Sequence, residues 1–355
     1  MKIHDDFTGG NIKFIKQCGD DVYLDHNLRD TKQYWFYWAF CVEGAAGKKI
    51  TFHMHPVSVG YWGAAMSYDL ENWHWVDNRN EDSFTYEFSE KENKVYFAHS
   101  MLYHPKRFLK VSEEIHLNTF ELCKSRKGRS VPACTIGSGE KSVILTARHH
   151  ACESTGSYVL EGVLREFSEN PIEEATVFCV PFVDYDGVVD GDQGKGRTPH
   201  DHNRDYMKEG SIYPETAAIR EYVEKHGCNY GFDFHSPWHR YDENDTAFIV
   251  RNSVEKLSKV ERFSKILEKQ ITPNSLKYSS KNDFPPMTDW NRPCENFSCT
   301  MNSRPECEIA HTLECTYFGT ADNKVSEAKL IELGRCYART IKEYMKGEKN
   351  ENNLL

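Results

Sequence analysis

His150 and Glu153 are the residues whose types and spacing point most directly to metal chemistry. Imidazole nitrogen and carboxylate oxygen both bind zinc, and a catalytic zinc site keeps one coordination position for water or substrate. The β-forming segment 142–147 runs into this pair and a helical pattern follows it, so a strand-to-helix turn can bring both side chains to one ion. The spacing H-x-x-E is weak evidence alone, because about one occurrence is expected by chance.

A third ligand must come from another segment of the chain. The predicted strand 230–235 ends on His235. In open α/β sheets the binding crevice lies at the carboxyl ends of the strands, and His150 occupies the same kind of position. We therefore expect His150 and His235 to face one site, although His235 alone is equally consistent with a capping or core histidine.

A second H-x-x-E occurs at His311 and Glu314. This segment has the pattern of a strand, in which positions i and i+3 point to opposite faces. His311 is therefore a poor partner for Glu314 on one ion, and we expect it to pack against the sheet or to point outward. Glu308 and Glu314 are two carboxylates near this strand with the chemistry of a general base.

The segment Ala147–Ser154 has the form A-R-x-H-x-x-E-[ST]. In this form, and in the order of the later segments, the chain resembles the zinc carboxypeptidases, also called funnelins, and most closely their cytosolic carboxypeptidase branch. By motif the resemblance covers roughly residues 118–345, and the β-rich N-terminal part is similar to the sandwich that precedes the catalytic domain in that branch. It implies one zinc ion held by His150, Glu153 and His235, and it selects His150 rather than His149.

Segments between the second and third ligands extend the resemblance. The family has N-P-D-G, then an arginine, then D-x-N-R. Here residues 184–187 read D-Y-D-G, Arg197 follows, and residues 201–204 read D-H-N-R. Asp184 and Tyr185 depart from the family's Asn and Pro, which affects the expected turn but not the ligands. The family's substrate-side tyrosine has no matching frame in this chain.

The resemblance implies a role for each of these residues. Asn203 and Arg204 would bind the terminal carboxylate of a peptide, since a guanidinium offers two parallel hydrogen bonds to a carboxylate. Arg197 would donate to the oxyanion of the tetrahedral intermediate. Asp201 would fix the tautomer of His150 from outside the metal's ligand shell. The alternative is a solvated loop with surface ion pairs.

Only Glu314 falls in the frame of the family's T-[LM]-E-[SP] strand. The resemblance therefore implies that Glu314 is the general base, which takes a proton from the attacking water and later gives it to the leaving amine. The alternative is a buried ion pair in the sheet. Arg304, which precedes Glu314 in the chain, is a candidate for lining the pocket of the C-terminal side chain.

Composition sets bounds on the class of protein. The chain has 355 residues, the length of about two domains, with 39% hydrophobic and 28% charged residues. A formal net charge of -10 argues against general nucleic-acid binding. No apolar run approaches the roughly 18 residues of a membrane span, and the first residues have no apolar signal-peptide core. We therefore expect a cytoplasmic protein without membrane or nucleic-acid partners, and its 12 scattered cysteines to be reduced.

The first third of the chain has the pattern of short strands. Runs rich in aromatic and β-branched residues at 34–40, 49–55 and 95–98 are separated by turn signals, which is typical of a β-sandwich. The pattern changes near 112–118. We predict a sandwich domain over residues 1–115, a catalytic domain over 116–348 and a frayed tail over 349–355.

From residue 116 onward, strand and helix patterns alternate, which indicates an α/β domain. The predicted strands are 131–136, 143–148, 176–183, 230–235, 246–251 and 309–317. The predicted helices are 153–167, 215–226, 254–270 and 326–345.

These observations lead to one functional hypothesis. The chain is expected to be a zinc metallocarboxypeptidase, with an N-terminal antiparallel β-sandwich and an α/β/α mixed-sheet catalytic domain. It would hydrolyse the C-terminal peptide bond of a peptide or protein tail by metal-activated water. Two alternatives stay open. One is a zinc amidohydrolase of the same architecture acting on acylated amino acids or cell-wall peptides, and the other is a catalytically silent binding protein.

Overall fold

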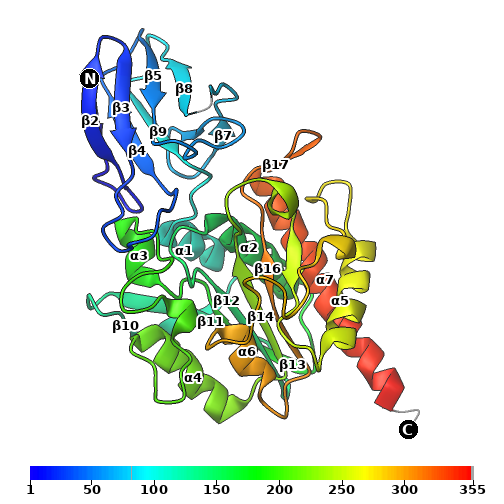
Figure 1. The fold of residues 1–355 in the computed structure, drawn as a ribbon. Coiled ribbons are helices and arrows are strands. Elements are labelled where there is room, and N and C mark those ends of the chain that lie inside the picture. The colour runs from blue at the N-terminus through cyan, green and yellow to red at the C-terminus, as the bar shows by residue number, and fades with distance from the viewer. Residues whose placement is uncertain (81, 353–355) are drawn as a thin grey trace.

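The N-terminal part of the chain has an apolar core of its own, and the larger core of the C-terminal part also includes sandwich residues such as Ala39, Ala65 and Ala98. The computed structural model describes residues 1–80 and 82–352, in which two packed β-sheets precede a larger domain of helices around a mixed sheet (Figure 1). The predicted fold class, a β-sandwich followed by an α/β/α domain, is confirmed.

Two sheets form the sandwich. The first contains, in spatial order, β1 (Lys2–His4), β4 (Ala39–Glu43), β9 (Lys94–Ala98), β6 (Ala65–Ser67) and β7 (His74–Trp75). The second contains β2 (Lys13–Cys18), β3 (Asp21–Asp25), β5 (Lys49–His53) and β8 (Ser83–Glu87). Neighbouring strands pair antiparallel except β3 and β5, which are parallel. Alternate side chains such as Ile50 and Phe52 point between the sheets, where they meet Phe40 and Phe97.

The strand predicted at 34–40 is wrong for residues 34–38, since β4 begins at Ala39. The backbone of Tyr37 pairs instead with a side chain: its N–H donates to Gln193 Oε1 at 2.9 Å, and its carbonyl accepts from Gln193 Nε2 at 2.8 Å. The neighbouring rings of Trp35 and Phe36 pack against Trp238. Trp35, Phe36 and Tyr37 therefore contact the C-terminal domain, whereas Trp38 packs in the sandwich core against Phe40 and Phe84.

The C-terminal domain is built on a seven-stranded mixed sheet. Its spatial order is β10 (Asn118–Lys124), β11 (Ser130–Ile136), β13 (Ala175–Val180), β12 (Lys141–Ala147), β14 (Tyr230–His235), β16 (Ile309–Glu314) and β15 (Phe248–Val250). The four central strands β13, β12, β14 and β16 are parallel, and the outer strands join them antiparallel. The carboxyl ends of β12, β14 and β16 therefore meet at one edge of the sheet.

Helices cover both faces of this sheet (Figure 1). One face packs on α2 (Ser154–Glu169), α5 (Leu257–Gln270) and α7 (Glu327–Asn352), and the other on α4 (Pro214–His226) and α6 (Phe297–Asn302). The alternation of strand side chains sets this arrangement, because Val143 and Leu145 belong to the first core and Ile144 to the second. Helices on both faces explain why β12 is buried at nearly every position and carries the apolar run Val143–Leu145.

Shorter elements complete the fold. They are α1 (Pro105–Glu114), α3 (Tyr185–Asp190), the pair β17 (Gly319–Thr320) and β18 (Asn323–Lys324), and 3-10 turns at His202–Arg204, Asp242–Asp245 and Ser280–Asn282. α1 lies between the sandwich and the central sheet in sequence, and its Phe108 and Val111 are buried. We propose that the boundary between the two domains lies after residue 115.

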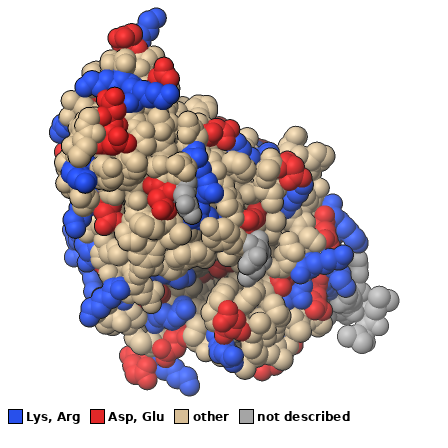
Figure 2. Space-filling model, turned by 45° about the horizontal axis from the view of Figure 1, so that its top comes forward, with Lys and Arg blue, Asp and Glu red and all other residues tan. Residues whose placement is uncertain are grey.

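The C-terminal helix is longer than predicted. α7 continues to Asn352, through part of the segment 349–355 predicted to be frayed, and residues 353–355 lie outside the described residues. Within the described residues, no helix combines the length and the apolar character needed to cross a bilayer. The twelve cysteines form no disulfide among these residues. Acidic and basic side chains are interspersed on the face drawn in Figure 2.

Candidate metal centre and substrate pocket

The strand register places the chemistry-bearing residues side by side. In the parallel pair β14 and β16, His235 is the Cα partner of Glu314. On β14, Asp233 and His235 are two residues apart and therefore point to the same face. Both strands end here, so the side chains face the crevice at the carboxyl edge of the sheet.

The turn between β12 and α2 presents the other two candidate ligands. Arg148 has φ +61°, a left-handed conformation that is uncommon for a residue with a side chain. Its guanidinium folds back and donates from Nε to Ala151 O at 2.9 Å and from Nη1 to Tyr103 O at 3.1 Å. Glu153 immediately precedes α2, but its carboxylate does not cap the helix. The turn therefore leaves the side chains of His150 and Glu153 directed into the crevice.

His150, Glu153 and His235 come together as predicted. Their candidate ligand atoms all lie within 4.8 Å of one another. His150 Nδ1 is 2.8 Å from Glu153 Oε1, and His235 Nδ1 is 2.7 Å from Glu153 Oε2. The two Nδ1 atoms are 3.2 Å apart. All three side chains are at most 2% exposed.

The outward ring nitrogens face carboxylates. His235 Nε2 is 2.7 Å from Asp233 Oδ2, and His150 Nε2 is 3.6 Å from Asp201 Oδ2, an ion-pair distance. A carboxylate favours the proton on the nitrogen that faces it, so both Nδ1 lone pairs are directed at the carboxylate of Glu153. Three electron-rich atoms in this arrangement repel one another unless a cation lies between them. A donor set of two imidazoles and one carboxylate fits a zinc ion.

The electrostatics of the buried site point in the same direction. Burial lowers the pKa of His235, but Asp233 and Glu153 outweigh it and hold that pKa well above its ordinary value. Burial raises the pKa of Glu153, but His150 and His235 outweigh it and hold it well below its usual range. The site therefore stabilises positive charge at its centre, which a bound metal ion supplies.

A second group with metal-ligand chemistry lies beside this one. It consists of His149, Asp233 and His235. Both ring nitrogens of His149 already have partners, since Nδ1 is 2.8 Å from Asp233 Oδ1 and Nε2 is 2.8 Å from the hydroxyl of Tyr206. His149 therefore belongs to the hydrogen-bond network that orients Asp233, and the first group is the better metal site.

Glu314 faces the same crevice from β16. Its side chain is 8% exposed, and its Oε2 has no hydrogen-bond partner among the described residues. Burial raises the pKa of Glu314 to about 7. His311 points to the opposite face of the strand, where its Nε2 lies 2.6 Å from the hydroxyl of Tyr337. A carboxyl group with a pKa near neutrality is suited to proton transfer at physiological pH.

A polar pocket opens over these side chains. It is lined by His150, Lys195, Asn203, Arg204, His235, Val250, Asn252, Trp290, Asn291, Arg292, Cys294, Asn296, Thr312 and Glu314. Asn203 Nδ2 lies 3.3 Å from His235 Nε2, and Arg204 Nη1 donates to Asn203 O at 2.7 Å. Asn203 and Arg204 are thus at the pocket together, as the sequence predicted.

Arg197 and Arg304 do not line this pocket. Arg197 Nη2 lies 2.6 Å from Asp184 Oδ2, 3.4 Å from Asp192 Oδ2 and 3.5 Å from Asp30 Oδ2. Three carboxylates therefore hold the guanidinium that was expected to face the oxyanion.

Arg304 follows α6 and pairs with two other carboxylates. Its Nη1 is 2.8 Å from Glu224 Oε1, and its Nε is 2.6 Å from Glu306 Oε1. Glu306 lies just before the start of β16, whereas Glu314 lies at its end. The expectation that Arg304 lines the side-chain pocket therefore finds no support, because the length of a strand separates it from the metal centre.

Two residues of the site were missed at the sequence level. Asp233 was recognisable, because it stands two positions before His235 on one strand and so shares its face. Lys195 has no periodic signal, since it stands in an irregular loop between two glycines. Its Nζ lies 3.9 Å from Glu153 Oε1.

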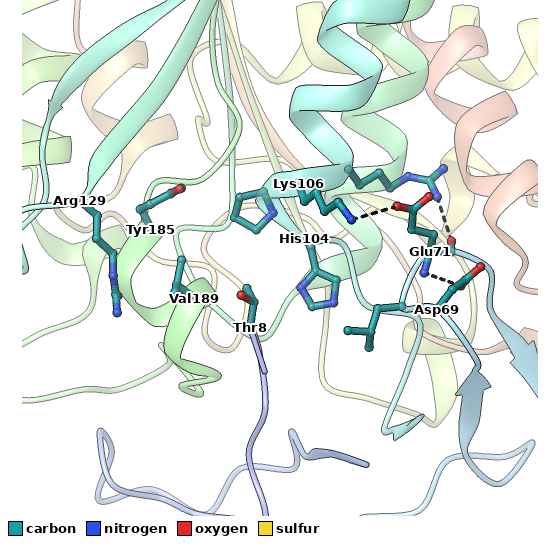
Figure 3. Close-up of a pocket in the computed structure, with 11 residues that line it drawn as sticks. Thr8, Asp69, Glu71, His104, Lys106, Arg129, Tyr185 and Val189 are labelled. Atoms are coloured by element: carbon teal, nitrogen blue, oxygen red, sulfur yellow. Dashed lines mark hydrogen bonds and ion pairs between the residues drawn. The ribbon is translucent and has the colours of Figure 1, made fainter. Parts of the chain in front are cut away.

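A second pocket, of about 380 Å³, has a different character (Figure 3). Tyr185 and Val189 line one side of it, and His104 and the ion pair between Lys106 and Glu71 line the other. None of the three candidate ligands lines it. The pocket with the chemistry of a hydrolase is therefore the one at the strand ends.

Comparison with known proteins agrees with this geometry. A metallo-carboxypeptidase from Burkholderia cenocepacia has a TM-score of 0.80 to this chain, covering 98% of this chain and 99% of that chain at 19% identity. The chain has the metallo-carboxypeptidase fold. Within this fold, the group of His150, Glu153 and His235 has the chemistry to hold a metal ion.

Sequence relatives connect this metallo-carboxypeptidase fold to the cytosolic branch. Residues 3–99 match the family model described as the cytosolic carboxypeptidase N-terminal domain. Cytosolic carboxypeptidase 2 of Xenopus tropicalis is 30% identical in an alignment 149 residues long, and the match covers 35% of this chain but only 15% of that protein. An uncharacterised protein of Zymomonas mobilis is 25% identical in an alignment 256 residues long, and the match covers 66% of this chain and 67% of that protein. The predicted resemblance to the cytosolic carboxypeptidases is confirmed for the segments that these comparisons match.

Proposed function

We propose that this protein is a zinc metallocarboxypeptidase that removes the C-terminal residue from a peptide or protein tail. The observation that carries the proposal is the convergence of His150, Glu153 and His235 beside Glu314, whose Oε2 has no hydrogen-bond partner in the described part of the chain. Asn203 and Arg204 line the same pocket and supply donors for a terminal carboxylate. A cytoplasmic location is proposed from the names of the cytosolic relatives.

The metal would be held by His150 Nδ1, His235 Nδ1 and the carboxylate of Glu153. When bound, zinc polarises a carbonyl oxygen and lowers the pKa of water to about 7. Asp233 and Asp201 keep the protons of the two histidines on Nε2, so that the Nδ1 lone pairs remain available to the metal.

The chain's own residues would then manage the substrate and the proton. Arg204 and Asn203 hold the terminal carboxylate, which places the last peptide bond over Glu314. Glu314 accepts a proton from the attacking water as its oxygen bonds to the carbonyl carbon. The C–N bond then breaks, and Glu314 returns the proton to the leaving amine. One water is consumed, and the products are a shortened peptide and a free amino acid.

A peptide panel tests the proposal. Each sequence is offered once with a free C-terminal carboxylate and once with a C-terminal amide, and released amino acid is measured by mass spectrometry. We expect single-residue release from the free acids only, because the amide removes the charge that Arg204 binds. Removal of the metal with a chelator abolishes release, and added zinc restores it.

The same panel separates the alternatives. Equal cleavage of free and amidated peptides, or cleavage of acylated amino acids only, indicates a zinc amidohydrolase. A protein that binds no zinc and releases nothing from any substrate indicates a silent binding protein. Either result contradicts the proposed carboxypeptidase.

A further inference from the structure

Lys195 lies on the loop between α3 and the 3-10 turn at His202–Arg204, and its ammonium group is within ion-pair distance of the candidate ligand Glu153. We propose that Lys195, rather than Arg197, donates the hydrogen bond that stabilises the oxyanion in peptide hydrolysis. This role rests on the proposed function, since it concerns the charge that develops on the carbonyl oxygen of the scissile bond.

Lys195 is positioned at the reacting centre. Its Nζ lies 3.9 Å from Glu153 Oε1, and it lines the same pocket as His150, His235 and Glu314. The Nζ also lies 5.6 Å from the centre of the Trp35 ring. Its side chain is 32% exposed, so the ammonium group is held near the ligands and still reaches a bound substrate.

Arg197 is held elsewhere. Its Nη2 contacts Asp184, Asp192 and Asp30, and its side chain is 14% exposed. Asp184 is fully buried, so turning Arg197 toward the pocket would leave a buried carboxylate without its cation. Arg197 therefore neutralises these three carboxylates and is not available to a substrate.

The loop backbone directs Lys195 toward the candidate ligands. Gly194 and Gly196 flank it with φ +77° and +61°, and a Cβ on Gly194 would lie 2.2 Å from the backbone nitrogen of Ala151. The N–H of Gly194 donates to Asp30 Oδ2 at 2.8 Å, and that of Gly196 donates to Asp201 Oδ2 at 3.2 Å. The loop is therefore packed against the ligand-bearing turn.

This position suits a charge that forms only during reaction. As the attacking water bonds to the carbonyl carbon, the carbonyl π electrons move to the oxygen, and a Lys195 N–H donates to that oxygen. The proton stays on Nζ, and the electrons return to the carbonyl when the C–N bond breaks. A donor placed where charge develops lowers the barrier more than it strengthens ground-state binding.

The test compares three variants in the zinc-loaded protein: Lys195→Met, Lys195→Arg and, as the control cation on the same loop, Arg197→Lys. We expect Lys195→Met to lower kcat about 10²–10³-fold with a much smaller change in KM, and Lys195→Arg to retain part of the rate. Arg197→Lys should stay within about threefold of wild type in kcat, since it contacts no reacting atom. Thermal unfolding checks that each variant is folded.

A second readout does not depend on turnover. The probe is a phosphonate analogue of the best peptide in the panel, in which a tetrahedral anionic phosphorus replaces the scissile carbonyl. We expect Lys195→Met to weaken phosphonate binding by calorimetry about as much as it lowers kcat, while zinc remains at one ion per chain.

Each outcome has a distinct meaning. Unchanged phosphonate binding in folded Lys195→Met overturns the proposal, as does a loss of zinc that accounts for the whole effect, since Lys195 would then only neutralise Glu153. A folded Arg197→Lys that loses as much kcat as Lys195→Met also overturns it. A wild type that neither cleaves peptides nor binds the phosphonate refutes the proposed function itself, whereas failure of the Lys195 role alone leaves wild-type cleavage intact.

Discussion

At the residue scale, the orientation of two imidazole rings determines what the site can bind. Asp233 and Asp201 face the Nε2 atoms of His235 and His150, so both Nδ1 atoms turn toward Glu153. This arrangement is unfavourable without a cation. The buried carboxylate of Glu314 lines the same crevice, where the proposed general base is needed.

Replacing Glu314 by Gln should separate metal binding from catalysis. The substitution keeps the shape of the side chain but removes its proton acceptor, so we expect kcat to fall about 10²–10⁴-fold while zinc stays at one ion per chain. Peptide release and metal content by plasma mass spectrometry measure the two effects. Glu308 stands directly before the start of β16, at the opposite end of the strand from Glu314. Glu308→Gln is therefore the control and should leave kcat and zinc content unchanged. Turnover at the wild-type rate in Glu314→Gln would refute the general base.

Replacing Asp233 by Asn should weaken the metal site from outside its ligand shell. Asp233 orients His235 through Oδ2 and accepts from His149 and Thr146 at Oδ1. Loss of its charge leaves the Nε2 proton of His235 less fixed, so we expect zinc affinity to fall about 10–100-fold. Competition with a chromophoric chelator measures the affinity. An affinity equal to wild type would show that Asp233 has no part in orienting the ligand.

The candidate ligands and the base were predictable because each has a distinctive side chain at a strand end. Which basic side chain lies at the pocket was not predictable. Whether Arg197 or Lys195 reaches the site depends on Asp184 and Asp192, at the two ends of α3, and on Asp30, which is distant in the sequence. No local pattern in the sequence encodes that competition, so the oxyanion donor could be assigned only from the folded chain.

At the element scale, the position of α2 fixes the ligand-bearing turn, and α7 fixes α2. The two helices cross in backbone contact: a Cβ on Gly334 of α7 would lie 1.9 Å from Val159 O of α2, and one on Gly162 of α2 would lie 1.9 Å from Ile331 O of α7. Only glycine allows this approach. The strands of the central sheet other than β10 were predicted within a few residues, since runs of apolar and β-forming residues are a local property. The segment 34–38 was not, because the side chain that pairs with it, Gln193, is 156 residues from Tyr37.

Substituting Ala for Gly334 should therefore destabilise the catalytic domain. The added methyl group meets backbone atoms, which cannot rotate away, so we expect a loss of about 1–3 kcal/mol in the free energy of unfolding. Gly347→Ala on the same helix is the matched control, since its methyl group meets only the end of the flexible Arg262 side chain. Urea denaturation measures both. Equal stability of the two variants would contradict the close helix crossing.

At the scale of the whole molecule, aromatic rings and neutral histidines join the sandwich to the catalytic domain. His239 stacks on Phe36 with ring centroids 4.4 Å apart, and its Nδ1 lies 3.2 Å from His99 Nε2 at the end of β9. Burial, and then the neighbouring Arg240, lower the pKa of His239 to about 3. Burial also lowers the pKa of His99 well below its ordinary value.

This contact should make the fold sensitive to acid. An unfolded histidine has a pKa of about 6.5, so between about pH 6.5 and pH 3 the unfolded state binds more protons at His239 and stability falls as the pH falls. His239→Phe keeps the stacking and removes the titration. When the pH falls from 7 to 5, the free energy of unfolding of both metal-free proteins is compared. We expect it to fall by up to about 2 kcal/mol less in His239→Phe than in wild type. Urea unfolding at the two pH values measures the difference, and parallel losses would contradict the buried neutral state.

The central claim is that His150, Glu153 and His235 hold one metal ion. Anomalous diffraction at the zinc absorption edge, from crystals of the zinc-loaded protein, locates that ion directly. We predict a single strong peak within about 2.0–2.2 Å of His150 Nδ1, His235 Nδ1 and a carboxylate oxygen of Glu153. A peak beside His149 and Asp233 instead, or no peak at the ends of β12 and β14, would contradict it.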